Sequence, residues 1–291
     1  MQNLSGILLV LFSSTCFGVM PVFAHWVYES GCNPMSLLWV RFNVAAIVLW
    51  LVLGVQRIPP PRLRHCLLLM AMGSLYVAQS LCYFTALTLI PASLVALLLY
   101  LYPAIVTGLA MVFLGEPLGR RKLGALGLSL LGVILTIGID RGNSTWGLVL
   151  GVLMAWLYAI YILLVSKILN QERSALACLT WVMTGAGFVY SGLVGLRGWA
   201  LPQSSQGWAA LGAIGLISTA LAVVTLFAGI KRIGATSAAT LSTWEPVVTI
   251  VTASVFLGDR LSPLSWVGGS LILIAVLMIS CAPRSSVSSP T

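Results

Sequence analysis

Long apolar stretches, separated by short polar or Pro/Gly-containing breaks, follow one another along the whole chain. About twenty apolar residues cross the hydrocarbon core of a bilayer as a helix, and ten stretches come close to or exceed that length. They cover residues 4–24, 34–53, 66–87, 92–114, 123–139, 147–165, 174–196, 208–230, 234–257 and 264–281. The pattern predicts an all-α polytopic membrane protein with ten transmembrane helices joined by short loops.

The composition agrees with this pattern. Of the 291 residues, 59% are hydrophobic and only 7% are charged, whereas a soluble domain carries about 25% charged residues. The six cysteines form no Cys-x-x-Cys pair and fall mostly in apolar stretches, which favours core residues over a zinc or disulfide framework. We therefore expect no metal and no cofactor. The two histidines and sparse acids also argue against an integral-membrane enzyme.

The basic residues predict the orientation in the membrane. With the N-terminus in the cytoplasm, the inside loops hold eleven of them: Arg57, Arg62, Arg64, Arg120, Arg121, Lys122, Lys167, Arg173, Lys231, Arg232 and Arg284. The outside loops hold three, Arg141, Arg197 and Arg260. This asymmetry follows the positive-inside rule and predicts an inner-membrane protein with both termini cytoplasmic. It also accounts for the net charge of +9 without a nucleic-acid partner, since no basic stripe with interleaved aromatics occurs.

An internal repeat predicts the architecture. When residues 90–128 are set against 233–271, twelve of the 39 positions are identical, among them Pro103 with Pro246. The run Phe-Leu-Gly-acid also recurs, ending at Glu116 and at Asp259. We expect a first five-helix half over 1–140, a second over 146–282 and a short cytoplasmic tail over 283–291. Because five is odd, the halves enter the membrane from opposite faces, an inverted repeat found in many secondary transporters.

The same motifs resemble a known family. Leu-Gly-Glu-Pro-Leu at 114–118, Leu-Gly-Asp-Arg-Leu at 257–261, Trp244-Glu245-Pro246 and Arg41-Phe42 are similar to those of the ten-helix drug/metabolite transporters of the EamA type. The resemblance extends over essentially the whole chain. It implies an inner-membrane carrier, usually an exporter of metabolites or amino acids, with a central cavity between the halves.

Pro103 and Pro246 are candidate kinks or hinges. Each lies about 17 Å into its span, near the membrane midplane. Proline removes one helical hydrogen bond, so the carbonyls of Leu99 and Ser242, four residues earlier, should lose their usual donors. Backbone freed at this depth must face protein, water or ligand. The alternative is a fixed structural kink in each helix.

Glu245 is the one acidic residue that the pattern places well inside the hydrocarbon. An ionised carboxylate there costs at least a few kcal/mol unless it is paired, hydrogen-bonded or protonated. The functional hypothesis is that Glu245 couples proton entry to substrate exit or contacts a substrate amine. The structural alternatives are a partner for Arg41 or a neutral acid bonded to the kinked backbone.

Arg41 is the only basic residue inside a span. It is a candidate for bidentate binding of a substrate carboxylate, but anchoring to lipid headgroups or pairing with Glu245 is favoured, since arginines near span ends commonly snorkel. A single intramembrane cation argues against phosphorylated sugars, which need several.

Polar and aromatic side chains within the spans supply further cavity candidates. Tyr76, Gln79 and Tyr83 share one helix face. The remaining candidates are Tyr102, Trp156, Ser242 and Trp244, with ordinary packing as the alternative for each. Such residues suit an amphipathic or aromatic solute.

The sequence therefore predicts a secondary carrier that exports small organic metabolites by alternating access, with proton coupling as a hypothesis. The partners expected are the solute, the lipid bilayer and, if coupling holds, protons. The alternatives are a flippase for a lipid or a lipid-linked substrate, and a non-transporting membrane receptor or assembly factor. No Walker-type phosphate loop occurs, which argues against direct drive by ATP.

Overall fold

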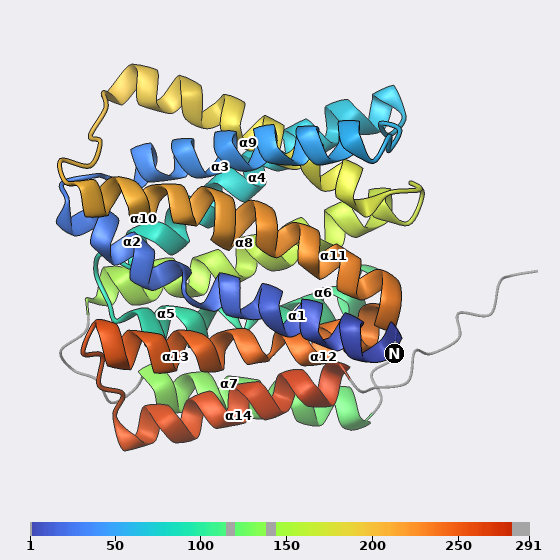
Figure 1. Cartoon of the computed structure of the whole chain (residues 1–291). Coiled ribbons are helices and arrows are strands. Elements are labelled where there is room, and N and C mark those ends of the chain that lie inside the picture. The colour runs from blue at the N-terminus through green and yellow to red at the C-terminus, as the bar shows by residue number, and fades with distance from the viewer. Residues whose placement is uncertain (1, 115–119, 138–143, 281–291) are drawn as a thin grey trace, which may run out of the picture.

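The computed structural model describes residues 2–114, 120–137 and 144–280. Every regular element in these ranges is helical, and the helices run side by side as a bundle (Figure 1). Taken in chain order and with interrupted helices joined, they form ten stretches. The first half contains α1 (Gln2–Gly18), α2 (Met20–Glu29), α3 (Pro34–Val55), α4 (Leu63–Ala86), α5 (Ala92–Leu99), α6 (Tyr102–Leu114) and α7 (Arg120–Ile137). The second half contains α8 (Thr145–Leu169), α9 (Ala175–Arg197), α10 (Ser205–Gly215), the π-helix η1 (Leu216–Leu221), α11 (Ala222–Ile233), α12 (Ala235–Ser242), α13 (Trp244–Phe256) and α14 (Pro263–Ser280).

Local capping explains where several helices begin and end. The Asn33 side chain accepts a hydrogen bond from the Ser36 amide at 2.8 Å and starts α3, with Pro34 in the first turn. Serine hydroxyls start α8, α9 and α10 in the same way, at Ser144, Ser174 and Ser204. Gly198 and Gly234, both at positive φ, follow α9 and α11. The predicted span boundaries therefore agree with the observed ones to within a few residues.

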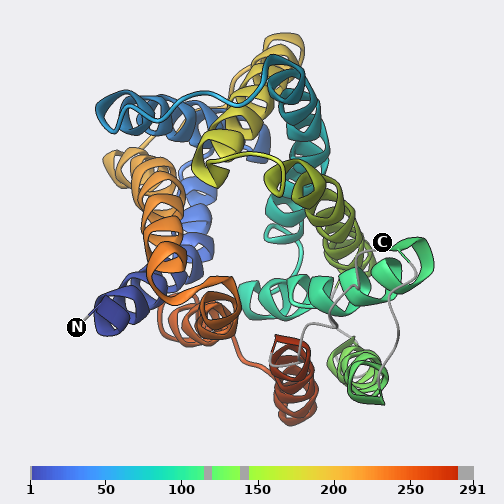
Figure 2. The ribbon, with the colours of Figure 1, turned by 90° about the vertical axis from the view of Figure 1, so that its right-hand side faces the viewer.

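Seven helical stretches of the described ranges are long and apolar enough to cross a membrane by length and composition. The apolar parts of α7 and α14, Leu123–Leu135 and Pro263–Met278, are shorter. These two helices pack along one another and lie outside the ring formed by the other spans (Figure 2). The chain is a multi-pass membrane protein, as its apolar pattern predicts.

The packing of the ten spans follows a pseudo-two-fold rule. Span 1 (α1–α2) packs on span 8 (α10–η1–α11), and span 6 (α8) packs on span 3 (α4). Span 3 also contacts span 7 (α9), while span 8 contacts span 2 (α3). Spans 2 and 7, 4 (α5–α6) and 9 (α12–α13), and 5 (α7) and 10 (α14) pair with their own equivalents. This exchange of partners between halves is the packing expected of two inverted five-helix repeats.

Small residues allow a close approach of the α4 and α9 backbones. A Cβ atom added to Gly73 would lie 2.7 Å from the Val182 carbonyl oxygen, and one on Gly185 would collide with the backbone of Met70. Only glycine fits such contacts between helix backbones. Spans 3 and 7 therefore pack with their backbones in close contact.

Several sequence predictions fall outside the described residues. These are the first repeat motif at 115–118 with Glu116, the outside Arg141, and the tail over 283–291 with Arg284. The domain limits of 1–140 and 146–282 consequently stay predictions at their inner edges.

Candidate functional site

A cavity of about 310 Å³ occupies the middle of the bundle, within the ring visible in Figure 2. Its lining comes from both halves and consists of Ser13, Ser14, Phe17, Met20, Arg41, Tyr76, Gln79, Ser80, Tyr83, Leu99, Tyr100, Tyr102, Tyr158, Tyr161, Val165, Leu169, Leu179, Met183, Thr219, Val223, Leu226, Phe227, Ser242 and Glu245. Leu169 is the last residue of α8, and Phe227 lies near the middle of α11, the last helix of its span. The cavity therefore extends toward the end of the bundle that carries the N-terminus.

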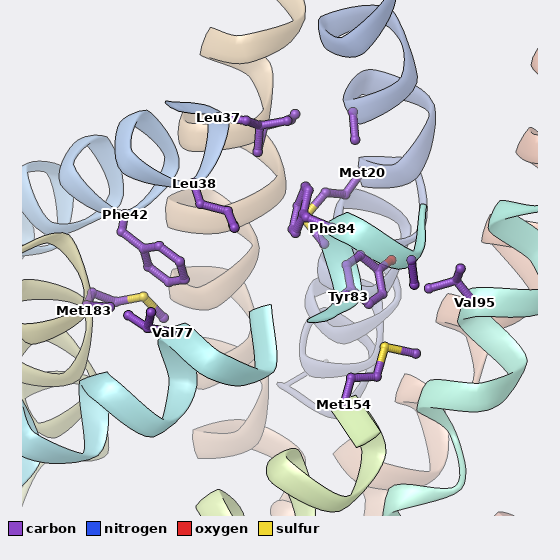
Figure 3. Packing of buried hydrophobic residues seen from close by; sticks show 14 of the residues in the cluster. Met20, Leu37, Leu38, Phe42, Val77, Tyr83, Phe84, Val95, Met154 and Met183 are labelled. Atoms are coloured by element: carbon purple, nitrogen blue, oxygen red, sulfur yellow. The ribbon is translucent and has the colours of Figure 1, made fainter. Parts of the chain in front are cut away.

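Apolar packing closes the opposite side of the cavity. Met20, Phe84, Val95 and Met154 belong to one buried cluster there (Figure 3). The Tyr28 hydroxyl of α2 donates to the Phe84 carbonyl of α4 at 2.9 Å and ties two spans of this wall together. We call this side of the bundle the closed end and the side with the N-terminus the open end.

The two repeat spans that carry the prolines are splayed differently at the two ends. At the closed end, α5 packs against α13. At the open end, the equivalent pair α6 and α12 makes no comparable contact among the described residues. Spans 4 and 9 therefore meet at one end and diverge at the other, which is the asymmetry expected of one state in an alternating pair.

Both spans are interrupted where the prolines predict an interruption. The helix breaks between α5 and α6, just before Pro103, and between α12 and α13, just before Pro246. The Ser242 carbonyl, which loses its helical donor to Pro246, accepts a 2.8 Å hydrogen bond from the Tyr100 hydroxyl instead. Tyr100 itself lies in the first break, so one side chain bridges the two interrupted helices.

The same phenol contacts the intramembrane carboxylate. Glu245 is half-buried in the first turn of α13, and its Oε2 lies 3.2 Å from the Tyr100 hydroxyl. The hydroxyl proton is thus shared between the Ser242 carbonyl and the Glu245 carboxylate. No cationic nitrogen of the described residues lies within 4.0 Å of Glu245, so the predicted pairing with Arg41 is not formed in this structure.

Arg41 differs from the headgroup anchor that its depth suggested. Its side chain is 4% exposed, and its Nε donates to the Thr219 Oγ1 at 3.0 Å. The guanidinium carbon lies 5.2 Å from the ring centre of Phe42 and 5.1 Å from that of Phe84, both within cation–π range. Arg41 lines the cavity, and no carboxylate of the described part of the chain lies within 4.0 Å of its guanidinium nitrogens.

A π-helical turn holds the partner of Arg41 in place. Within η1, the Thr219 hydroxyl donates to the Ile214 carbonyl five residues earlier, at 2.8 Å, while it accepts from Arg41. One added residue in a helical turn is a feature often found at functional sites. Here it turns a threonine hydroxyl toward the guanidinium.

Tyrosines form the wall of the cavity on the side of α4 and α8. The ring centres of Tyr76 and Tyr161 are 5.0 Å apart, and those of Tyr102 and Tyr158 are 4.8 Å apart in an edge-to-face arrangement. Gln79, one turn beyond Tyr76, is 6% exposed and has no hydrogen bond to the described residues. A buried amide without a protein partner needs water or a ligand to satisfy it.

The structure brings most of the sequence candidates together. Seven line the cavity: Arg41, Tyr76, Gln79, Tyr83, Tyr102, Ser242 and Glu245. Pro103 and Pro246 do not line it, but each directly follows a lining residue, Tyr102 or Glu245. Trp156 and Trp244 do not line it and are 46% and 45% exposed. On α8 the cavity face is set by Tyr158 and Tyr161, and helical periodicity turns Trp156 toward the outside.

Three lining tyrosines and one threonine were not singled out from the sequence. Tyr158 and Tyr161 are spaced i, i+3, which is a helix-face signal that could have been used. Tyr100 and Thr219 carry no such signal, because their roles depend on a helix break and on a π-turn.

A second polar contact lies in the loops at the open end. The Glu172 carboxylate contacts His65 Nδ1 and accepts from the Arg62 amide at 3.2 Å. The hydrogen bond from His65 lowers the pKa of Glu172 below its usual value. This contact joins the loop between spans 2 and 3 to the loop between spans 6 and 7. Within the described ranges, no group of three or more His, Cys, Asp or Glu side chains could hold a metal ion.

Comparisons with known proteins agree with the architecture. Residues 4–138 and 145–281 each match the EamA-like transporter family. An uncharacterized transporter of Bacillus subtilis (strain 168), YcbK, is 26% identical over 279 residues, which are 91% of this chain and 89% of the relative. An uncharacterized transporter of Archaeoglobus fulgidus is 27% identical over 278 residues, covering 92% of this chain and 94% of the relative.

A solved crystal structure shares the fold. It superposes with a TM-score of 0.65 at 17% sequence identity, and the match covers 94% of this chain and 96% of the other. At this identity the likeness concerns the fold alone.

Proposed function

Because the chain belongs to the EamA-like transporter family, we propose that it is a secondary carrier for small organic solutes that bear a carboxylate. Amino acids and amphipathic or aromatic acids are the solutes that fit best. The observation that carries the proposal is a pair of buried groups in the cavity lining. Arg41 has a hydrogen bond through Nε alone and no counter-ion among the described residues, and Gln79 has no hydrogen-bond partner among them.

The Arg41 guanidinium would bind the anionic group. A buried cation with no counter-ion is costly, and a solute carboxylate would offset that cost through two parallel charge-assisted hydrogen bonds. Thr219 engages Nε alone, which leaves the terminal nitrogens for the solute. With one cation in the described cavity lining, phosphorylated sugars and nucleotide-sugars fit poorly.

The other two sides of the cavity suit the rest of such a solute. The tyrosine wall offers stacking area for an apolar or aromatic side chain. Glu245, held by Tyr100, would receive a substrate amine or a proton. Charge of opposite sign on the two walls favours a zwitterion over a simple hydrocarbon.

Transport would follow from exchange between two packings of spans 4 and 9. The present state packs α5 on α13 and leaves α6 apart from α12. The inverted repeat makes the reverse arrangement equally available, with α6 on α12 and the closed end opened. The proline breaks would supply the hinges.

We further propose export across the inner membrane, with both termini cytoplasmic. The excess of basic residues in loops at the open end supports this orientation. The cavity would then load from the cytoplasm and release outside. Coupling to proton entry at Glu245 would supply the driving force.

The test is a metabolite-wide counterflow screen in proteoliposomes at two imposed pH gradients. We expect carboxylate-bearing solutes to exchange, with a rate that depends on the gradient. Arg41→Lys, which cannot make the bidentate contact, should slow exchange of these solutes about tenfold or more. Met183→Leu, at the equivalent place in α9 and also in the cavity lining, is the matched control and should change the rate little. Equal exchange of solutes lacking an anionic group, or an unaffected Arg41→Lys variant, would contradict the proposal.

A further inference from the structure

The Leu-Gly-acid motif at the end of span 9 forms a specific turn. The Leu257 amide donates to the Ala253 carbonyl at 2.9 Å, and the Asp259 amide reaches the same carbonyl at 3.3 Å. Gly258 lies between them at φ +70°, a conformation that side chains rarely adopt. The glycine thus ends α13 and directs the following acid back over the bundle.

Asp259 uses this turn to cap a helix of the other half. Its Oδ2 accepts hydrogen bonds from the Ser93 amide at 3.0 Å and from the Ser93 hydroxyl at 3.1 Å. Ser93 is in the first turn of α5, whose own N-cap residue, Pro91, supplies no side-chain hydrogen bond. A carboxylate at a helix N-terminus satisfies orphan amides and complements the helix dipole. The first turn of α5 is therefore completed by a residue 166 positions away.

The position of this contact relates it to the state of the cavity. It lies at the closed end, beside the packing of α5 on α13. Tyr100, at the other end of α5, reaches Ser242 and Glu245. Polar contacts at both ends of α5 thus fasten it to span 9. If the closed end opens by separating α5 from α13, the contact to Asp259 must break.

We propose that the Asp259–Ser93 contact is a state-specific latch between the two halves, which holds the closed end shut in this state. The inference rests on the proposed alternating access and adds a positioning residue to it. Asp259 does not line the cavity and touches no solute. It sets how often the closed end opens.

The surroundings allow the latch to open and close. Asp259 is partly exposed and lies beside a surface pocket of about 270 Å³ that His25, Pro91 and Leu257 also line. Water can therefore replace the cap when the contact breaks. Arg260 is exposed and forms no ion pair with Asp259, and the His25 imidazole pairs with Glu29 of its own helix at 3.2 Å. In the described structure the carboxylate is free of a cation that would hold it away from Ser93.

The experiment measures how fast a cavity residue becomes reachable through the closed end. The six native cysteines of the full-length chain are replaced by serine, and Ser14 in the cavity lining becomes the single reporter, Ser14→Cys. A membrane-impermeant maleimide is applied in right-side-out and in inside-out vesicles. We expect Asp259→Ala to speed labelling from the closed-end side about fivefold, since loss of a side-chain cap shifts a helix-end equilibrium by that order.

Conservative variants separate the latch from a general loss of structure. Asp259→Asn keeps an acceptor oxygen and should label near the parent rate, whereas Ser93→Ala, which keeps the amide donor, should give a smaller increase than Asp259→Ala. Glu29→Ala removes an exposed acid at the same end without touching α5, and should leave labelling unchanged. Thermal unfolding in detergent checks that each variant is folded.

Two outcomes would overturn the latch. One is closed-end labelling of both Asp259→Ala and Ser93→Ala at the parent rate. The other is an equal rise in Asp259→Ala and Glu29→Ala. Failure of the proposed function has a different signature, because the counterflow screen would then find no solute while the labelling series could still show a faster closed-end reaction in Asp259→Ala.

Discussion

The broken spans α5–α6 and α12–α13 occupy equivalent places in the two halves and supply different chemistry. Both break just before an aligned proline. The first break places two phenols at the cavity, Tyr100 and Tyr102. The second, where Glu245 stands in the place of Tyr102, supplies a carboxylate and the Ser242 carbonyl, which accepts a hydrogen bond from Tyr100. The repeat therefore preserves the helix break before each proline, while the aligned side chains have taken on separate roles.

Spans 2 and 7 show the same division. Arg41 of α3 aligns with Met183 of α9, and both line the cavity. One half therefore contributes the buried cation and the other half the carboxylate. An exact copy of either half would place two like charges in one small chamber, which is unfavourable.

The largest effect is expected from removing the carboxylate of Glu245, which distinguishes span 9 from span 4. Glu245→Gln should abolish the pH-dependent component of transport and leave the protein folded, because the amide keeps a hydrogen-bond acceptor for Tyr100 but cannot take up a proton. Tyr102→Phe changes the aligned residue by one hydroxyl and should leave most transport intact. Counterflow at two pH gradients measures both, and unchanged pH-dependent transport by Glu245→Gln would dismiss the coupling role.

A smaller effect is expected from restoring the backbone at each break. In Pro246→Ala, residue 246 regains an amide that can donate to the Ser242 carbonyl and compete with Tyr100. We expect transport to slow several-fold as the span becomes stiffer. Pro103→Ala should slow transport less, because no side chain of the described residues donates a hydrogen bond to the Leu99 carbonyl. Similar rates for both variants and the parent would show that neither break acts as a hinge.

The smallest effect is expected at the loop contacts, which differ between the closed and the open end. At the closed end, Gln203 and Asn33 join their loops through backbone hydrogen bonds to Ser30 and Ala200, at 2.8 and 3.3 Å. At the open end, the equivalent loops are joined through Glu172 and His65.

Only the open-end contact titrates in the acid range. The pKa of Glu172 is lowered in the folded state, so the unfolded chain binds a proton more readily, and the contribution to stability is lost as pH falls through the folded pKa. We expect the melting temperature in detergent to drop as the pH falls from neutral through this lowered pKa. Glu172→Gln should flatten part of that drop. An identical pH profile for the parent and this variant would count against the contact.

Hydropathy predicted the spans well, because a bilayer demands long apolar helices whatever their neighbours are. The repeat predicted the inverted pairing for a similar reason, since aligned prolines and glycines report backbone geometry. The surroundings of Arg41 could not be predicted. They depend on Thr219, which is 178 residues away and is turned inward by a π-helix that has no simple sequence signal.

The aromatic residues show where pattern reasoning fails within a helix. Trp244 precedes Glu245, but a rotation of about 100° per residue sends it outward, where its indole Nε1 donates to the Thr15 hydroxyl at 3.3 Å. Tyr100 shows the opposite case, because it lines the cavity although the sequence pattern did not select it. Its role emerges only when two breaks from different halves meet, and no single helix carries that information.

The π-turn of η1 also fixes the phase of everything that follows it in span 8. Its surplus residue rotates α11 by about 100° relative to an uninterrupted helix, which brings Val223 and Phe227 to the chamber. Deleting one residue between 216 and 221 would therefore rotate α11 about its axis and turn a different set of its side chains toward the cavity. Insertions and deletions at this turn offer a route by which descendants of one scaffold could acquire new cargo without altering their loops.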